Sequence, residues 1–278
     1  MDKYVLIVAG GKGLRMGGDL PKQFIPMRGK PLLMHTLEAF HRWDASARII
    51  LVLPEDHQPY WNMLCKEIGC KVPHAIVKGG DTRFFSVKNG LDWLLAERRR
   101  KGEEDSGLSL VAVHDGVRPF VSPEVVEACF DKAAVTGAVI PVVPMIDSLR
   151  ETDEKGSHPV DRSRYMAVQT PQVFHLELLT KAYEQPYSSL FTDDASVVEA
   201  MGHAIDTVPG DRENIKITTP FDLKIADIAR DGQLLQYVRN IAQDIVDADP
   251  EACHPENDIL WQQLRALRKT NVNWASIS

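Results

Sequence analysis

Short apolar runs rich in Val, Ile and Leu alternate along this chain with segments of helical periodicity, and this alternation constrains the fold more than any other feature. The apolar runs are residues 4–9, 49–53, 110–113 and 139–143. The segments of helical periodicity are residues 32–43 and 60–68. Because the apolar runs are nearly continuous, they predict strands that are covered on both faces. The alternation therefore predicts an α/β fold of three layers, α/β/α, with a mainly parallel sheet built from βαβ units.

Helix ends and polar stretches predict how the rest of the chain is organised. Ser122 before Pro123 predicts a capped helix that ends at Gly137. Thr219 before Pro220 predicts a second helix of the same kind, which ends at Gly232. Between residues 144 and 165 a polar stretch with a central glycine predicts either a projecting hairpin or a loose loop. Helical periodicity returns after residue 232, which predicts a helical extension over residues 233–278.

Composition excludes several classes of protein. The 278 residues include 32 Lys and Arg against 39 Asp and Glu, a net charge of −7, so we expect no nucleic-acid surface driven by overall charge. The apolar runs are far shorter than the roughly 20 residues of a membrane-spanning helix. No secretory signal is recognisable, and the four cysteines include no C-x-x-C pair. We therefore expect a cytoplasmic protein without a membrane span, a disulfide framework or a zinc site.

A glycine-rich segment follows the first predicted strand. Residues 9–17 read AGGKGLRMG, and PKQ follows at residues 21–23. Glycines let backbone N–H groups approach phosphate oxygens, while Arg15 and Lys22 supply the charge that a polyphosphate requires. The segment is not a Walker A loop, and the G-x-G-x-x-G fingerprint fails at Met16. It predicts a phosphate cradle, although a tight strand-to-helix turn alone would look similar.

This segment and four further motifs, in order along the chain, resemble those of the 2-C-methyl-D-erythritol 4-phosphate cytidylyltransferases of non-mevalonate isoprenoid biosynthesis. The further motifs are GGDTRFFSV at residues 79–87, HDGVRP at 114–119, QTPQ at 169–172, and TDDAS at 192–196 with NIK at 214–216. The resemblance extends from about residue 4 to about residue 230. Residue 116 is glycine, where alanine is common in that family.

The resemblance implies a Rossmann-like nucleotidyltransferase fold with a projecting β-arm. Residues 1–232 would be the catalytic domain, residues 144–165 an arm that reaches into the partner of a homodimer, and residues 233–278 the extension. The enzyme would transfer a cytidylyl group from CTP to 2-C-methyl-D-erythritol 4-phosphate, giving 4-diphosphocytidyl-2-C-methyl-D-erythritol and pyrophosphate. Mg²⁺ would be its divalent cation. Both substrates are anions, so catalysis would rest on positioning and charge neutralisation.

The resemblance also implies a role for individual residues. The catalytic cations would be Arg15, Lys22, Arg162 and Lys216. The nucleotide would be bound by Ala9, Gly10, Gly11, Gly13, Gly80, Asp81, Ser86, Asp115 and Gly116. The sugar phosphate would be bound by Arg118, Ser148, Thr170 and Thr192. Asp115 would be a partner of the metal ion, which would be held mostly by the CTP phosphates.

Three other functions are weighed against this one. Residues 9–13 and 215–220 also look like ribitol 5-phosphate cytidylyltransferases, but residues 160–162 and 192–196 favour the methylerythritol branch. A nucleotide-dependent oxidoreductase is disfavoured by the broken glycine fingerprint and by Leu53-Pro54 where an acidic residue would end the second strand. A non-catalytic nucleotide-binding protein would not need a second cationic cluster.

Two local features have simpler interpretations than catalysis. His114 beside Asp115 fits a hydrogen-bonded structural histidine better than a catalytic base. Asp193 and Asp194 could be a metal pair, but after Thr192 they fit the acidic first turn of a capped helix better.

Overall fold

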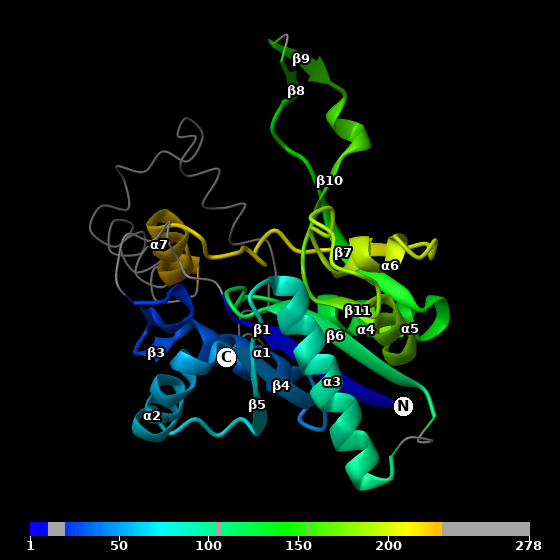
Figure 1. The fold of residues 1–278 in the computed structure, drawn as a ribbon. Helices are drawn as coiled ribbons and strands as arrows, with labels where there is room; N and C mark the ends of the chain where they lie inside the picture. The colour runs from blue at the N-terminus through cyan, green and yellow to red at the C-terminus, as the bar shows by residue number, and fades with distance from the viewer. Residues whose placement is uncertain (11–19, 104–106, 155, 230–278) are drawn as a thin grey trace, which may run out of the picture. The chain divides into compact units, whose positions relative to one another are not determined.

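The apolar runs predicted as strands lie at the centre of one large sheet (Figure 1). Its parallel half is formed by β6 (Ser109–Asp115), β1 (Asp2–Val8), β4 (Arg48–Leu53) and β5 (His74–Lys78), hydrogen-bonded in that order. Since all four strands run the same way, their carboxyl ends meet at one edge of the sheet. The prediction of a mainly parallel sheet is confirmed.

The other half of the sheet is mixed. β11 (Gln172–His175) is antiparallel to both β6 and β7 (Ala138–Pro144). β7 also pairs with antiparallel β10 (Met166–Val168) and with parallel β12 (Asp206–Pro209). These antiparallel strands bring the motif at residues 169–172 back to the carboxyl end of β6.

Alternate residues of the central strand face two separate apolar cores. In β1, Val5 and Ile7 pack into one core, while Tyr4 and Leu6 pack into the other, and all four are fully buried. The first core includes residues of α1 (Leu32–Trp43), α2 (Gln58–Ile68) and α4 (Pro123–Thr136). The second includes residues of α3 (Arg83–Lys101), α5 (Leu176–Ala182) and α6 (Asp194–Glu199). The three-layer prediction is therefore confirmed.

The predicted ends of one helix are present in the structure. The Ser122 hydroxyl accepts a hydrogen bond from the Val125 N–H at 3.3 Å, Pro123 is the first residue of α4, and Gly137 ends it with φ of 90°. The second predicted helix, α7 (Pro220–Ala229), begins at its proline. Its predicted closing glycine, Gly232, lies outside the residues that the structure describes.

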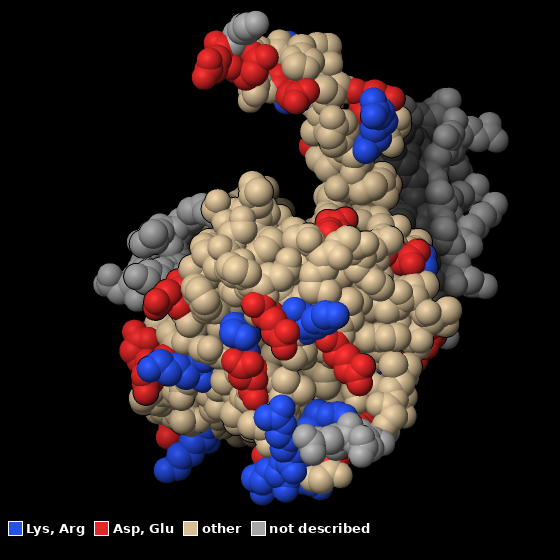
Figure 2. Space-filling view, turned by 45° about the vertical axis from the view of Figure 1, so that its right-hand side comes forward, with Lys and Arg blue, Asp and Glu red and all other residues tan. Residues whose placement is uncertain are grey.

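The polar stretch between β7 and β10 forms a hairpin. β8 (Leu149–Asp153) and β9 (Gly156–Val160) pair antiparallel, and the hairpin projects away from the main sheet (Figure 1). In the space-filling view, acidic side chains gather at the tip of this arm; the part of the body nearest the arm shows few charges, and charged side chains of both signs gather lower on the body (Figure 2). Of the two interpretations of residues 144–165, the projecting hairpin holds.

Short elements complete the fold. β2 (Pro26–Met27) and β3 (Lys30–Pro31) form a small hairpin before α1. The 3₁₀ turns among the described residues are η2 (Lys22–Phe24), η3 (Glu55–His57) and η4 (Arg162–Arg164).

The computed structural model describes residues 1–10, 20–103, 107–154 and 156–229. The chain divides into two units, Met1–Ala226 and Asp227–Ser278, and the second lies almost entirely outside the described residues. The helical extension over residues 233–278 thus stays a prediction. No helix in the described ranges has the length and apolar character to cross a membrane.

We expect the close approach of α3 to the sheet to limit substitution at Gly90. A Cβ at Gly90 would lie 2.6 Å from Leu6 Cδ2 and 3.0 Å from Val52 Cγ2. Gly90→Val should therefore lower the free energy of unfolding by about 1–3 kcal/mol, because overpacking outweighs the better helix propensity. Denaturant unfolding measures this, with Ala96→Val on the exposed face of α3 as the control. Equal stability of the two variants would contradict the packing argument.

Candidate functional site

The candidate site lies at the carboxyl ends of β1 and β6, where ligands of parallel α/β sheets usually bind. Asp115 is the last residue of β6 and is in register with Val8 at the end of β1. The Gly116 N–H donates to the Val8 carbonyl at 2.9 Å, and the Thr36 hydroxyl donates to the Gly116 carbonyl at 3.0 Å. The backbone that carries Asp115 is therefore fixed from both sides.

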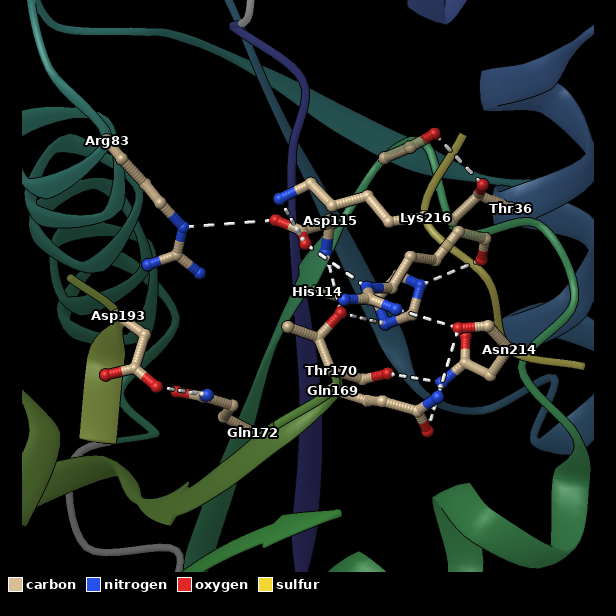
Figure 3. A network of polar contacts seen from close by, with 12 residues as sticks. Thr36, Arg83, His114, Asp115, Gln169, Thr170, Gln172, Asp193, Asn214 and Lys216 are labelled. Carbon is tan, nitrogen blue, oxygen red and sulfur yellow. Dashed lines mark hydrogen bonds and ion pairs between the residues drawn. The ribbon is translucent and has the colours of Figure 1, made fainter. Parts of the chain in front are cut away.

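Three cations face the Asp115 carboxylate (Figure 3). Lys216 Nζ lies 2.9 Å and Arg118 Nε 3.3 Å from Oδ2, while Arg83 Nε lies 3.9 Å from Oδ1. Burial alone would raise the pKa of the Asp115 carboxyl, but Lys216, Arg83 and Arg118 outweigh burial and hold this pKa well below its ordinary value. Asp115 is thus a permanent anion that orients its cationic neighbours.

The segment that carries Lys216 is anchored by its neighbour Ile217. The Ile217 N–H donates to the Val117 carbonyl at 2.9 Å, and its side chain is fully buried beside Met27 and Leu32. The Lys216 side chain, by contrast, remains 42% exposed. The anchored backbone therefore presents an accessible ammonium group.

Arg118 is held by the same segment. Its Nη1 donates to the Asn214 carbonyl at 2.7 Å, and the Asn214 amide donates to the Thr170 carbonyl at 2.8 Å. Burial lowers the pKa of Arg118, which is nevertheless paired with Asp115. The motifs at residues 114–119, 169–172 and 214–216, far apart in the sequence, meet in this network.

Thr170 and His114 support the backbone of Asp115 through hydrogen bonds. The Thr170 hydroxyl accepts the Asp115 N–H at 3.1 Å and lies 3.1 Å from His114 Nδ1. His114 Nε2 lies 3.0 Å from the Arg118 carbonyl. A carbonyl only accepts, so the proton is on Nε2, and Nδ1 accepts from Thr170. Burial lowers the pKa of His114 to about 4, which makes it a neutral structural residue, as predicted.

Arg83 joins α3 to α6. Its Nη1 and Nη2 donate to the two carboxylate oxygens of Asp194 at 2.9 and 2.6 Å. The Asp194 side chain is fully buried and also accepts the Tyr183 hydroxyl at 2.6 Å. Burial opposes the charge on Arg83, but Asp194 more than compensates and raises the pKa of the guanidinium.

The residues predicted to read the nucleotide lie at the start of α3. The Ser86 hydroxyl accepts the Gly80 N–H at 3.1 Å and donates to the Thr82 carbonyl at 2.9 Å, so it shapes the loop that presents Gly80 and the exposed Asp81. A Cβ on Gly10 would lie 3.9 Å from the Ser86 hydroxyl oxygen. The exit of β1 and this loop are therefore adjacent.

Three residues of the predicted phosphate cradle, Gly11, Gly13 and Arg15, lie outside the described residues. Ala9, which precedes them, is buried, and its N–H donates to the Val52 carbonyl at 3.0 Å. Lys22 follows them as the first residue of η2.

The Ala9 side chain also explains the small residue at position 116. A Cβ on Gly116 would lie 2.8 Å from the Ala9 Cβ. In this chain, an alanine at position 116 would force the ends of β1 and β6 to move apart.

Two predicted substrate residues lie on the arm. Ser148 and Arg162 are exposed, and Arg162 Nη1 donates to the Ile146 carbonyl within the arm. No hydrogen bond or ion pair between described residues joins Ser148 or Arg162 to Asp115.

Thr192 is exposed and precedes the cap of α6. Asp193 caps this helix through the Ser196 N–H at 2.9 Å and accepts the Gln172 amide at 2.8 Å (Figure 3). The interpretation of Asp193 and Asp194 as the start of a capped helix is thus confirmed, with Asp193 as the cap. Asp194 lies in the first turn and is the partner of Arg83.

The residues around Asp115 do not form a metal site of their own. Its Oδ2 faces Lys216 and Arg118, and no group of three His, Cys, Asp or Glu side chains suited to a metal ion occurs in the described ranges. A divalent cation needs several oxygen ligands. The protein groups therefore do not fit a resident metal ion, and a cation here would depend on oxygens from a ligand.

Two residues that received no predicted role complete the network. Arg83 lies inside the second motif, and Tyr183 lies outside all of them. One local signal pointed to Arg83: a cation in the first turn of a helix faces the positive end of the helix dipole and needs a compensating partner. The identity of that partner, Asp194, 111 residues away, carries no local signal.

Known proteins are similar to this chain in sequence and in fold. A family model described as 2-C-methyl-D-erythritol 4-phosphate cytidylyltransferase matches residues 4–230. A second, described as the C-terminal part of domain 3 of the ATP-dependent DNA helicase RecG, matches residues 199–278. The relative named 2-C-methyl-D-erythritol 4-phosphate cytidylyltransferase from Bacteroides fragilis is 56% identical over 226 residues, which are 81% of this chain and 98% of the relative. The one from Phocaeicola vulgatus is 55% identical over 82% of this chain and 99% of its own length.

Solved structures with the same name give the same result. The structure from Thermus thermophilus matches with a TM-score of 0.61 and 31% identity, covering 82% of this chain and 98% of its own. The Francisella tularensis structure matches with a TM-score of 0.65 and 29% identity, covering 82% and 99%. Sequence and fold agree: the chain belongs to the 2-C-methyl-D-erythritol 4-phosphate cytidylyltransferase family.

Proposed function

We propose that this protein transfers a cytidylyl group from CTP to 2-C-methyl-D-erythritol 4-phosphate in non-mevalonate isoprenoid biosynthesis. A phosphate oxygen of the sugar phosphate forms a bond to the α-phosphorus of CTP, the bond between the α-phosphorus and the bridging oxygen to the β-phosphorus breaks, and pyrophosphate leaves. The products are 4-diphosphocytidyl-2-C-methyl-D-erythritol and pyrophosphate. The observation that carries the proposal is the Asp115 cluster, with Lys216 and Arg118 on one carboxylate, in a chain of this family.

The cluster suits a reaction between two anions. The Lys216 ammonium has three N–H donors, of which the contact with Asp115 engages one. The others are available to oxygens of the sugar phosphate or of the reacting phosphorus. Because the cations are already in place, little reorganisation is needed when negative charge develops in the transition state.

No protein base is required in this proposal. A phosphate monoester, with a second pKa of about 6, is already a competent nucleophile near neutral pH. Asp115 has a lowered pKa, and His114 has both ring nitrogens hydrogen-bonded and is fully buried. These two residues therefore position the cluster and do not transfer protons.

The nucleotide and metal assignments follow from position. Gly10, Gly80 and Ser86 lie together at the ends of β1 and β5, which supports nucleotide binding there, with Arg15 and Lys22 on the triphosphate. Mg²⁺ would be held mostly by the CTP phosphates and would supply further charge neutralisation, since no group of three His, Cys, Asp or Glu side chains suited to a metal ion occurs among the described residues. The cytoplasm, where CTP is available, is the location that we propose.

We propose further that the enzyme is a homodimer in which each arm serves the site of the partner. Arg162 and Ser148 lie on an arm that projects from its own body, and no described contact links them to their own Asp115 (Figure 1). Ile146 and Tyr165 on the arm and Met166 at the adjoining start of β10 are exposed at 58, 45 and 47%, apolar surface that a partner would cover. Residues 1–232 would form the catalytic domain, consistent with a family match that ends at residue 230.

The substrate assignment is tested by pyrophosphate release from CTP with each of two acceptors. We expect turnover with 2-C-methyl-D-erythritol 4-phosphate and at least about a hundredfold lower kcat/KM with ribitol 5-phosphate, because the site must hydrogen-bond a specific set of hydroxyls. A preference for ribitol 5-phosphate would overturn the assignment. Binding of CTP without turnover of either acceptor would instead indicate a non-catalytic protein.

Lys216→Ala should lower kcat about a hundredfold or more, because it removes a preorganised charge from the reacting phosphates. Lys216→Arg keeps the charge and should retain part of the activity. Stability should fall as well, because the buried Asp115 carboxylate loses a counter-ion, so kcat is compared well below the unfolding midpoint of each variant. Lys88→Ala, a partly exposed lysine on α3, is the control and should match the unchanged enzyme. An unchanged kcat in Lys216→Ala would remove this residue from the reaction.

Mixing two inactive variants tests whether arms are exchanged. If Arg162 serves the partner's site, a dimer of one Lys216→Ala chain and one Arg162→Ala chain contains one complete site and one doubly defective site. Refolding the two variants together should therefore restore activity that neither has alone. If each arm serves its own body, no mixed dimer has a complete site, and activity should stay at the level of the separate variants.

A further inference from the structure

Arg83 occupies an unusual position for an arginine. It is the first residue of α3, directly after the cap Thr82, and the first turn of this helix holds no acidic residue. A positive charge there is repelled by the positive end of the helix dipole. The position is therefore maintained by something other than the helix itself.

Both terminal nitrogens of Arg83 are committed to the buried Asp194 carboxylate, at 2.9 and 2.6 Å. Such two-pronged pairs are strong and directional. Asp194 is held in turn by the Tyr183 hydroxyl, and it lies in the first turn of α6. The guanidinium plane is consequently fixed against two helices, and turning it toward a phosphate would break two charged hydrogen bonds.

The remaining nitrogen points to the catalytic cluster. Arg83 Nε lies 3.9 Å from Oδ1 of Asp115, the oxygen opposite the one that faces Lys216 and Arg118. Figure 3 shows Arg83 and Lys216 reaching Asp115 from different sides. Lys216 and Arg118 restrain the carboxylate through one oxygen, and the fixed charge of Arg83 near the other oxygen adds a second restraint on rotation about the Cβ–Cγ bond.

We propose that Arg83 is a positioning residue: fixed by Asp194, it holds the Asp115 carboxylate in the orientation that presents Lys216 and Arg118 to the substrates. It acts through Asp115 and touches neither substrate. The inference rests on the proposed transfer reaction and adds a residue to it. It also explains why the motifs at residues 79–87 and 192–196 occur together, since each supplies one half of the Arg83–Asp194 pair.

The test compares two backgrounds in the full-length protein. The paired change Arg83→Gln with Asp194→Asn removes both charges, so no buried charge remains without a partner. We expect kcat for pyrophosphate release to fall about tenfold to a hundredfold, as for a displaced catalytic group, while KM for CTP changes less than about threefold. In the Asp115→Asn background, the same paired change should lower kcat by less than about threefold, because the carboxylate through which Arg83 acts is absent.

A merely structural role gives a different result. If the Arg83–Asp194 pair only stabilised the fold, the paired change would reduce kcat by the same factor in both backgrounds, and that outcome would overturn the proposal. Rates are compared well below the unfolding midpoint of every variant. Arg100→Gln, the same substitution on the exposed far end of α3, is the control and should leave kcat unchanged. An enzyme that fails to release pyrophosphate before any substitution refutes the proposed function instead.

One further variant tests the role of Arg83 if the paired variant does not fold, or if the Asp115→Asn variant is too slow to measure. Arg83→Lys retains a cation beside Asp194, but its single ammonium cannot bridge both carboxylates as the fork does. We expect it to fold, with kcat reduced at least about fivefold because Asp115 is less restrained. Full activity in a folded Arg83→Lys variant would overturn the proposal.

Discussion

One buried carboxylate, shared among three cations, is the interaction on which the rest of the site depends. Removing a carboxylate from water is costly, and a buried charge is tolerated only when its partners compensate it. Lys216, Arg118 and Arg83 do so for Asp115. The carboxylate in return keeps like charges close together, at the point where we propose that the two anionic substrates meet. A chain of net charge −7 cannot attract polyanions through its average field, so this local arrangement has to supply the attraction.

The neutral groups around the cluster matter as much as the charged ones. His114 is fully buried beside Asp115 and supports the turn through Thr170 and the Arg118 carbonyl. A charged imidazole there would add a fourth cation and weaken the hold on Lys216. Burial keeps the ring neutral by lowering its pKa, so one side chain contributes rigidity without disturbing the balance of charge.

Much of the fold follows from local patterns, because the determinants are local. Continuous apolar runs marked the strands, and Ser122 with Gly137 marked the ends of α4. The resemblance of short motifs supplied Asp115, Arg118 and Lys216. The pairing of Arg83 with Asp194 could not be read in this way, because it joins two helix starts 111 residues apart, and neither has a sequence pattern that names the other. The arm was predictable as polar chain, but its hairpin pairing depends on backbone register that composition does not encode.

The cluster around Asp115 is assembled from segments that are far apart in the chain. Arg83, Asp115, Thr170, Asp194 and Lys216 come from five separate elements or loops, and the last of them enters only after β12. During synthesis, Asp115 therefore leaves the ribosome about a hundred residues before Lys216, and the intervening chain must close long loops before the carboxylate gains its main counter-ion. An amino-terminal fragment that ends before residue 216 therefore lacks the cation nearest to Asp115. In the proposed reaction, activity would thus depend on nearly the whole first unit, because its last cation is made near the end of that unit.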